Sequence, residues 1–580
     1  MAEIFIDNKR YEFEGQTKVL QFILDQGLEL PFFCYHPSLS IPANCRQCYV
    51  EAGQPVLNRE TGEYELDDNG ERVIRFFPKL MTACSLDATD GMVIKTHVTS
   101  ELVRRGQKDI LEFILINHPL DCPICDQAGE CPLQIQTYKY GPEGSRFEHK
   151  KVHKPKRIQL GPRVVLDAER CINCTRCVRF TEEISKSNQL TISQRGDHNY
   201  PITAPGTEFD DPYSINTVDI CPVGALTSTD FRFKARVWEM SSTPSIDITN
   251  AKGCAVDIWT RDNLVMRITP RYNPHVNDYW MPDAGREAYK IYNENRISRP
   301  EMVVNKDSIK TSWNNALLTI SEKLTGAETG KTLVFASAYA SVEDNYAIQQ
   351  FFARFANTTV IYVPDIKPGT GDDFLITDDQ APNSSGCKLL GINEVDADQA
   401  KGMIDSGTYE TLVILQEDLV GRGIASTESL TQYFSVYLGT NNNSTSRSAS
   451  VTIPITTAAE HFGSYVNVDG RIQRTLPAKE TLYTDRRLDL QMSMGRLDHY
   501  GTRFDNWVSD NNKIDCIPAW EFLVRLSHEM NLEFRYNEAR EIIDEIALKN
   551  SSFAGISYER MDRELGIALQ DQPSKELNPA

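Results

Sequence analysis

Histidine, long apolar runs and positive charge are all scarce in this chain, and each scarcity narrows what the protein can be. Only ten of its 580 residues are histidine, so a histidine beside a cysteine motif needs an explanation. No apolar run approaches the roughly 18 residues that cross a bilayer, which argues against direct membrane insertion. A net charge of −20 argues against nucleic acid or anionic lipid as the main partner. The sequence also contains no P-loop and no nucleophile elbow.

The cysteines are unevenly distributed. The N-terminus, "MAEIFIDNKRYEFE", alternates as strand residues do, so we expect no signal or transit segment and a protein that stays where it is made. Fourteen cysteines in such a chain favour metal ligands over disulfides. Eleven of them precede residue 222, and only Cys254, Cys387 and Cys516 follow. The N-terminal part is therefore expected to carry the metal chemistry.

The first ligand group has C-x10-C-x2-C spacing with a distant fourth cysteine, a longer-looped relative of the plant-type ferredoxin pattern. Its members are Cys34, Cys45, Cys48 and Cys84. Strand-like residues 3–7 and 10–14 and a helical pattern near 18–27 suit a β-grasp [2Fe–2S] domain. The polar, turn-rich segment 55–75 predicts an inserted surface hairpin. Four cysteines could also bind structural zinc.

The third ligand group has the spacing of a two-cluster bacterial ferredoxin from which one cluster site has been lost. Its members are Cys171, Cys174, Cys177 and Cys221. In such ferredoxins two C-x2-C-x2-C-x3-C-P runs exchange their fourth cysteines. The positions of the lost site hold Thr181, Asp211, Ser214 and Thr217. One [4Fe–4S] centre is therefore predicted here.

The second ligand group lies between these two in "HPLDCPICDQAGEC", and its members are His118, Cys122, Cys125 and Cys131. Eleven cysteines and one histidine make three sets of four, which favours His118 as a [4Fe–4S] ligand. A zinc site of the same four residues is an alternative. In a further alternative, His118 binds no metal and instead caps or packs at the end of the preceding helix. A histidine ligand leaves the centre one negative charge short of an all-thiolate centre, which by itself favours the reduced form.

Taken in order, the three motifs resemble the large iron–sulfur subunit of NADH-quinone oxidoreductase, respiratory complex I, over about the first 235 residues. The resemblance implies one [2Fe–2S] and two [4Fe–4S] clusters. Electrons would arrive from a separate flavin subunit that oxidises NADH and leave toward the quinone-side iron–sulfur subunits. The chain would be part of a proton-translocating enzyme without its own catalytic residue or substrate site. It would lie in the peripheral arm, on the cytoplasmic face of the bacterial inner membrane.

Two rival functions remain. The same module occurs in NAD-linked hydrogenases and formate dehydrogenases, so a diaphorase-type relay subunit is one alternative. The absence of further intact cluster motifs after residue 222 argues against a catalytic fusion. A zinc-stabilised structural scaffold is the alternative from a different class.

The rest of the chain resembles a shortened molybdopterin-oxidoreductase-type domain. Residues 459–473, "AEHFGSYVNVDGRIQ", are similar to a stretch of that superfamily. Its C-x2-C-x3-C-x27-C cluster motif falls here on Asp247, Asn250, Cys254 and Pro282. The resemblance therefore implies that this extra cluster is absent and Cys254 is a relic. We expect no molybdopterin.

The C-terminal part also has an α/β pattern by itself. Residues 332–337, 358–365 and 411–418 are short β-branched runs, and 341–356 is helix-like, which predicts a mostly parallel sheet. The apolar run 110–116 is expected to belong to a short core helix. The predicted domains are a [2Fe–2S] ferredoxin-type domain at 1–98, a histidine-ligated [4Fe–4S] domain at 99–145, a ferredoxin-like domain at 146–235, an α/β domain at 236–570 and a flexible tail at 571–580.

Overall fold

The structure is a computed structural model, and it describes residues 2–58, 61–304, 307–326, 331–483 and 512–569. The chain divides into two compact units, residues 1–238 and 239–580, and each is described by itself. The predicted tail, residues 571–580, lies outside the described residues.

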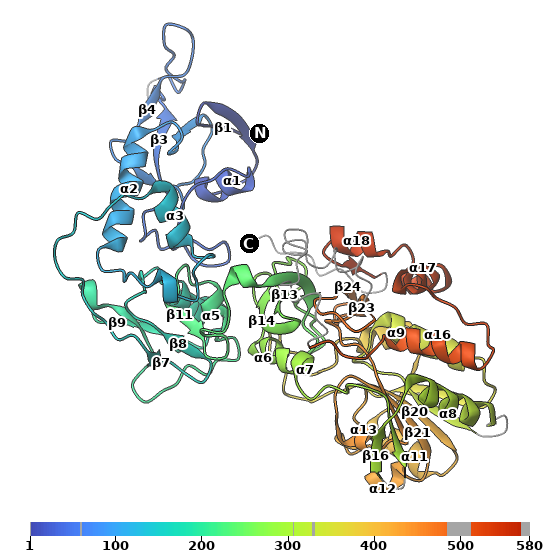
Figure 1. The fold of residues 1–580 in the computed structure, drawn as a ribbon. Coiled ribbons are helices and arrows are strands. Elements are labelled where there is room, and N and C mark those ends of the chain that lie inside the picture. The colour runs from blue at the N-terminus through green and yellow to red at the C-terminus, as the bar shows by residue number, and fades with distance from the viewer. Residues whose placement is uncertain (1, 59–60, 305–306, 327–330, 484–511, 570–580) are drawn as a thin grey trace, which may run out of the picture. The chain divides into compact units, whose positions relative to one another are not determined.

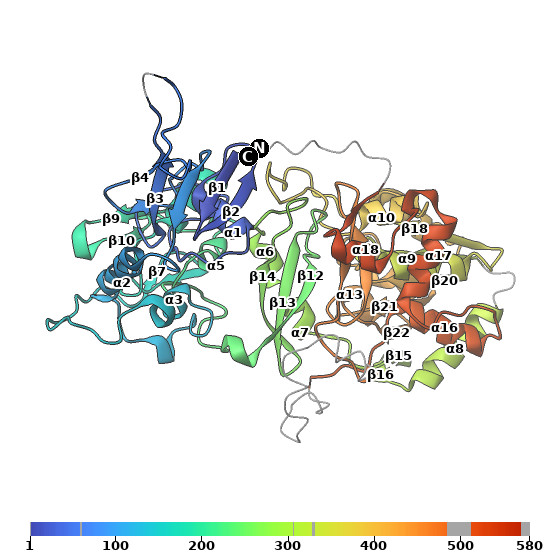
Figure 2. The ribbon, with the colours of Figure 1, turned by 90° about the horizontal axis from the view of Figure 1, so that it is seen from above.

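The first unit is built from short elements (Figures 1 and 2). They are β1 (Ala2–Ile6), β2 (Lys9–Phe13), α1 (Val19–Asp25), β3 (Tyr49–Pro55), β4 (Ile74–Phe76), β5 (Met81–Thr82), β6 (Met92–Lys95), α2 (Glu101–Leu115), η1 (Cys122–Ile124), α3 (Pro132–Tyr140), β7 (Ile158–Gln159), β8 (Val164–Leu166), α4 (Arg176–Arg179), η2 (Phe180–Ile184), β9 (Thr191–Ser193), η3 (Gly196–His198), β10 (Tyr200–Ile202), α5 (Asn216–Asp219) and β11 (Leu226–Ser228).

The first ligand group lies beside a mixed sheet with the order β2-β1-β6-β3-β4, in which β5 also pairs with β3. Strands β1 and β2 form an antiparallel hairpin, whereas β1 and β6 are parallel. Alternate residues Ile4 and Ile6 of β1 point into a core that also contains Val19 and Ile23 of α1. This core holds the ligand loop between α1 and β3 against the sheet.

The segment between β3 and β4 projects from this sheet (Figure 1). It folds back on itself through the antiparallel pairs Leu57 with Tyr64 and Leu66 with Arg72. Both leucines are more than half exposed. This agrees with the surface hairpin that the turn-rich sequence predicts.

The apolar run 110–116 is not a short core helix, and that expectation is wrong. It forms the last part of the 15-residue helix α2, which buries only the face carrying Val103, Gln107 and Leu111. Phe113 is 73% exposed. The buried Gln107 donates a hydrogen bond to the carbonyl oxygen of Tyr49. Because this polar residue lies on the buried face, a search for apolar repeats does not detect the full helix.

The second unit contains a three-stranded sheet, an eight-stranded sheet, a small β23-β24-β25 sheet and the helices around them. Its elements are β12 (Ser241–Ile246), β13 (Ala255–Arg261), β14 (Leu264–Pro270), α6 (Asp283–Glu287), α7 (Tyr289–Asn293), β15 (Glu301–Val304), β16 (Asp307–Lys310), α8 (Trp313–Gly326), β17 (Thr332–Phe335), α9 (Val342–Phe352), β18 (Thr358–Tyr362), α10 (Ser384–Leu389), β19 (Asn393–Glu394), α11 (Ala397–Asp405), β20 (Thr411–Leu415), α12 (Thr427–Leu430), β21 (Phe434–Gly439), α13 (Ser444–Ser448), β22 (Val451–Pro454), β23 (Gly463–Val466), β24 (Arg471–Thr475), α16 (Ala519–Glu529), α17 (Ala539–Lys549), α18 (Tyr558–Arg563) and β25 (Ile567–Ala568).

The predicted mostly parallel sheet is confirmed. Its order is β16-β15-β22-β21-β20-β17-β18-β19, and the strands from β22 to β19 run parallel. In β20, Leu412 and Ile414 belong to the core on one face, whereas Val413 and Leu415 belong to the core on the other. Because helices cover both faces, every residue of this strand is buried, which explains its continuous apolar sequence.

Candidate metal centres

The thiols of the first ligand group form two pairs. Cys34 contacts Cys45 through a hydrogen bond that lowers the pKa of the Cys34 thiol to about 6. A hydrogen bond with Cys48 lowers the pKa of the Cys84 thiol in the same way. Backbone amides also donate to Cys34 and Cys84, which favours their thiolate forms. A binuclear cluster binds two cysteines on each iron, so two pairs of thiols fit it.

The loop that carries this group is bent to surround the sulfur atoms. Ala43 and Arg46 both have left-handed backbone conformations, with φ of 50° and 58°. Such angles are rare outside glycine and are retained where the surrounding structure requires them. Here they lie on either side of Cys45 and turn the loop around that ligand.

The second ligand group follows α2. Cys125 is buried, Cys122 is exposed, and Cys131 is partly buried at the start of α3. Burial, together with the charges of Lys151 and Arg170, lowers the pKa of His118 to about 4, so its ring is neutral at pH 7. Its Nδ1 atom is buried without a hydrogen-bond partner among the described residues. A neutral imidazole with an unused nitrogen fits a metal ligand.

Lys151, rather than His118, caps helix α2. Its Nζ donates to the carbonyl oxygens of Leu115 and Ile116, both at 2.8 Å. A cation at this position satisfies the last carbonyls and complements the helix dipole. The alternative role of His118 as a helix cap therefore has no support in the described part of the chain. The sequence gives no local signal for Lys151, because it lies 35 residues after Ile116.

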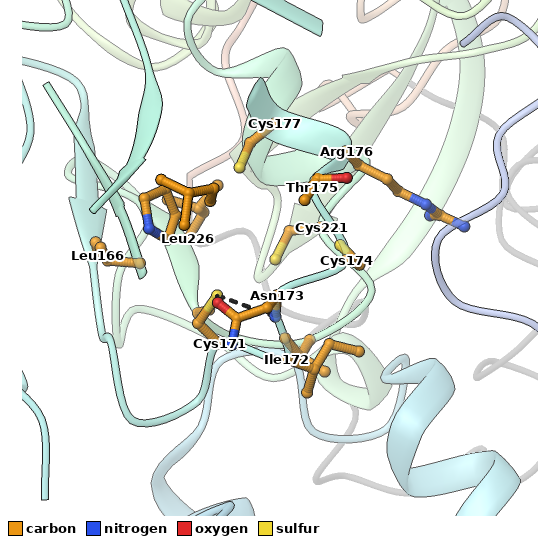
Figure 3. A pocket seen from close by; sticks show the side chains of 14 residues that line it. Leu166, Cys171, Ile172, Asn173, Cys174, Thr175, Arg176, Cys177, Cys221 and Leu226 are labelled. Atoms are coloured by element: carbon orange, nitrogen blue, oxygen red, sulfur yellow. Dashed lines mark hydrogen bonds between the residues drawn. The ribbon is translucent and has the colours of Figure 1, made fainter. Parts of the chain in front are cut away.

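The third ligand group surrounds a small cavity of about 20 Å³ (Figure 3). Cys174, Cys177 and Cys221 are buried, and burial raises the pKa of the Cys171 thiol to about 12. Asn173 has φ of 54°, and its amide donates to the Cys171 sulfur at 3.4 Å. Four inward thiols in an apolar enclosure fit a cuboidal cluster with one cysteine on each iron.

The positions of the lost partner site form internal hydrogen bonds instead. Thr217 donates to the carbonyl oxygen of Ser214 at 2.7 Å, and Thr181 donates to that of Val178 at 2.9 Å. The side chain of Asp211 accepts from the amide of Tyr213 at 2.7 Å. The four positions that replace cysteine are all buried, so they serve packing and local structure.

The third group contacts the first group directly. Arg179 donates through one nitrogen, Nη2, to the carbonyl oxygens of Cys34 at 2.6 Å and Cys174 at 3.3 Å. These two oxygens, one from each group, therefore lie within about 6 Å of each other. Arg176 donates to the carbonyl oxygen of Tyr35 from the same side. Both arginines lie inside the "CTRCVR" motif, but the motif does not reveal their contacts, because these are with residues far away in the sequence.

The third group also contacts the second. The Cys131 sulfur lies 3.7 Å from the carbonyl oxygen of Pro222, the residue after Cys221. A Cβ atom added at Gly224 would lie only 2.2 Å from the Cys125 sulfur. The third group therefore contacts both of the others, although it comes last in the sequence.

The fourth candidate ligand set, in the second unit, does not fit an iron–sulfur cluster. Asp247, Asn250 and Cys254 are buried, but only Cys254 supplies a thiol. The Asp247 carboxylate accepts from the amide and hydroxyl of Thr249 and points at Gly285, where a Cβ would lie 2.2 Å from it. Cys387 and Cys516 are also buried, separately from this set, and belong to the interior of the unit.

No set of three or more histidine, cysteine, aspartate or glutamate side chains is arranged for a single metal ion in the part of the chain that the structure describes. A zinc ion would draw four ligands to about 2.0–2.3 Å. A cluster holds each cysteine of a [4Fe–4S] centre on a different iron, so its ligands lie farther apart.

Within the described residues no helix is both long and apolar enough to span a membrane.

Known protein families match the chain in four stretches. Their descriptions are "2Fe-2S iron-sulfur cluster binding domain" for residues 1–99, "NADH-ubiquinone oxidoreductase-G iron-sulfur binding region" for 107–146, "NADH-quinone oxidoreductase subunit 3, ferredoxin-like domain" for 161–227 and "NADH-ubiquinone oxidoreductase NDSU1/NuoG-like, 4Fe-4S domain" for 240–290. The first three matches follow the order that the cysteine spacings predict. The fourth covers the region of Asp247, Asn250 and Cys254, in which only Cys254 supplies a thiol.

The chain is also similar to individual proteins. The chain is 36% identical over 355 residues to the NADH-quinone oxidoreductase G subunit of Rickettsia bellii, and the match covers 61% of this chain and 48% of that one. It is 35% identical over 359 residues to NADH-quinone oxidoreductase subunit 3 of Thermus thermophilus, covering 59% and 45%. The resemblance to the large iron–sulfur subunit of NADH-quinone oxidoreductase is thereby confirmed.

The match to these relatives is partial in length. The chain spans about half the length of the relatives that it matches. Among solved structures, a chain of an NAD+-reducing [NiFe]-hydrogenase in the H2-reduced state has a TM-score of 0.33 and 25% identity, and the likeness covers 41% of this chain and 91% of that chain.

Proposed function

We propose that this chain is an electron-relay subunit of NADH-quinone oxidoreductase. The first ligand group would hold a [2Fe–2S] cluster, and the second and third groups would each hold a [4Fe–4S] cluster. Such clusters supply one-electron transfer when bound. The chain itself contributes the ligands, the buried surroundings that exclude water, and the hydrogen bonds to sulfur that tune the potentials. None of its residues acts as a nucleophile or a general base.

The contact of the third ligand group with both others carries this proposal. A relay requires neighbouring centres, and the hydrogen bonds of Arg179 and the contact of Cys131 with Pro222 join the three groups in one compact unit. A scaffold of independent zinc sites has no need for such contacts. The order first, third, second is the path that they favour.

His118 would be the fourth ligand of the second group. The capping of α2 by Lys151 and the buried, unpartnered Nδ1 of His118 support this role. The second unit would be a degenerate molybdopterin-oxidoreductase-like domain without a molybdenum cofactor. In the complex it would have a structural role, as a second folded unit that other subunits can contact.

The partners would be the flavin- and NADH-binding subunit and the quinone-side iron–sulfur subunits. The complex would place this chain in the peripheral arm on the cytoplasmic face of a bacterial inner membrane. A diaphorase-type relay in an NAD-linked hydrogenase or formate dehydrogenase is the second candidate, because such complexes share the N-terminal module.

The test is anaerobic purification of the full chain, with iron and sulfide analysis, visible absorption and EPR. We expect about ten irons and ten sulfides per chain, from one binuclear and two tetranuclear centres. Stoichiometric zinc with a colourless protein would overturn the proposal, since zinc has a filled d shell. Purification from cells with the native partners then separates the two relay functions, because a hydrogenase or formate dehydrogenase subunit would be recovered with the chain only in the second case.

A further inference from the structure

Two arginines of the third ligand group lie between the first and third groups. Arg179 is 7% exposed and donates to Thr175 Oγ1 at 3.3 Å and to the carbonyl oxygens of Cys34, Ser40 and Cys174. These four hydrogen bonds all end on acceptors inside the protein. Cys34 and Arg179 are 145 residues apart in the sequence, so it is the fold that places Arg179 between the two ligand loops.

Arg176 lies beside it, one helical turn earlier. It donates to the carbonyl oxygens of Ile220 at 3.0 Å and of Tyr35, and its Nε is buried without a partner among the described residues. Its guanidinium also lies over the ring of Phe32, 5.9 Å from the centroid. It therefore joins the residue before Cys221 to the residue after Cys34.

Neither guanidinium has a carboxylate partner among the described residues, where all their hydrogen-bond acceptors are carbonyl or hydroxyl oxygens. Other buried arginines of this chain do have one. Arg170 pairs with Asp121 and Asp167, at 3.1 and 3.2 Å. Arg296 and Arg422 also pair with buried glutamates, at 2.7 and 2.6 Å. The two arginines between the ligand groups differ from these three in this respect.

Burying two positive charges without a nearby negative charge would lower the stability of the folded protein. The carbonyl oxygens that Arg176 contacts belong to Ile220 and Tyr35, which are the chain neighbours of the ligands Cys221 and Cys34. The charge of Arg176 is therefore within electrostatic range of ligands from both groups.

We propose that Arg176 and Arg179 are shared counter-ions of the clusters in the first and third ligand groups, and that they hold the reduction potentials of both centres up together. Four thiolates give an all-cysteine centre a net negative charge, and reduction adds one more. A fixed cation in a poorly solvated region favours the reduced form of every centre within its range. The arginines are positioning residues: they act on the potentials and also fix the distance between the two loops.

This inference rests on the proposed function, so the wild-type protein is measured first. The experiment is an EPR-monitored redox titration of the anaerobically purified full chain. Arg179→Gln should lower the midpoint potentials of both centres. We expect about a tenfold change in each reduction equilibrium constant, which is about 59 mV for a one-electron couple. Arg176→Gln, at a less buried position, should shift both in the same direction and serves where Arg179→Gln fails to fold.

Two controls separate charge from structure. Arg179→Lys keeps the charge but not the branched set of donors, so it should shift both potentials by less than half as much as Arg179→Gln. Arg195→Gln removes an equal charge from an exposed site of the same unit and should leave both potentials unchanged.

Each outcome is decisive. Assembled clusters with unmoved potentials in Arg176→Gln would overturn the counter-ion role, and a shift of one centre alone would overturn the sharing. A wild-type chain that lacks the two signals would instead refute the proposed function.

Discussion

A tight contact between the second and third ligand groups, at Gly224, gives a test of their arrangement. Gly224 lies three residues after Cys221, and it faces the sulfur of Cys125. An alanine there would place its Cβ 2.2 Å from this sulfur, whereas ordinary van der Waals contact begins at 3.4 Å. One of the two loops must therefore move by about 1.2 Å, since the difference cannot be absorbed by a small adjustment.

The cost of this displacement follows from its surroundings. Cys125 is a candidate ligand and buried, so its side chain cannot rotate away without leaving the metal site. Overpacking a closed interior by one methyl group costs about 1–3 kcal/mol. We expect Gly224→Ala to lower the free energy of unfolding by that amount and to perturb the second-group cluster, with a smaller effect on the third group through the Cys221 loop.

The assay is iron content and EPR of the anaerobically purified variant, with denaturant unfolding of the same sample. Gly144→Ala is the matched control, because an alanine Cβ there has nothing within 4 Å. It should leave the clusters intact and change stability little. A Gly224→Ala protein with wild-type iron content, spectra and stability would show that the two groups do not approach each other as described.

Further predictions concern single sites. His118→Ala should make the second-group cluster labile, whereas His118→Cys should preserve it at a lower potential; wild-type protein without strong nitrogen hyperfine coupling in pulsed EPR would contradict ligation. Cys84→Ser should abolish or shift the binuclear EPR signal alone, and deletion of the 55–75 hairpin should not. Cys254→Ala should leave iron content unchanged, whereas a fourth cluster in the wild type would disprove the relic assignment. Burial raises the pKa of Glu343 to about 7. Its contribution to stability is therefore full below about pH 4.3 and is lost as the pH rises through 7. Glu343→Gln should flatten this dependence, of up to about 3 kcal/mol, in denaturant unfolding between pH 4 and 8.

The sequence predicts most of each ligand set because the C-x2-C spacing is local, whereas Cys84 and Cys221 lie far from the rest of their groups. A C-x2-C run specifies its chemistry within four residues, and buried parallel strands such as β20 are recognisable from continuous β-branched and apolar residues. The sheet direction could be predicted for the same reason, from alternation of strands with a helix at 341–356, although the observed α9 is shorter, Val342–Phe352.

Contacts between distant segments could not be predicted in this way. The role of Lys151 at the end of α2 depends on a loop that returns to the helix, and the position of Arg179 depends on two ligand loops meeting. The contacts of the third group with both others have the same origin. Gln107 is a polar residue on the buried face of α2, so the apolar repeat of this helix is incomplete in the sequence. Its burial depends on a hydrogen bond to Tyr49, a distant residue, and so could not be predicted locally.

The replaced ligand set of the second unit has a consequence for the evolution of the chain. A four-cysteine cluster site there would require three new cysteines, in place of Asp247, Asn250 and Pro282. Cys254 alone is already a neutral, packed thiol, since burial raises its pKa well above the usual value. Any side chain larger than glycine at 285 would collide with the Asp247 carboxylate. No single substitution would therefore give this region a complete set of four thiolates.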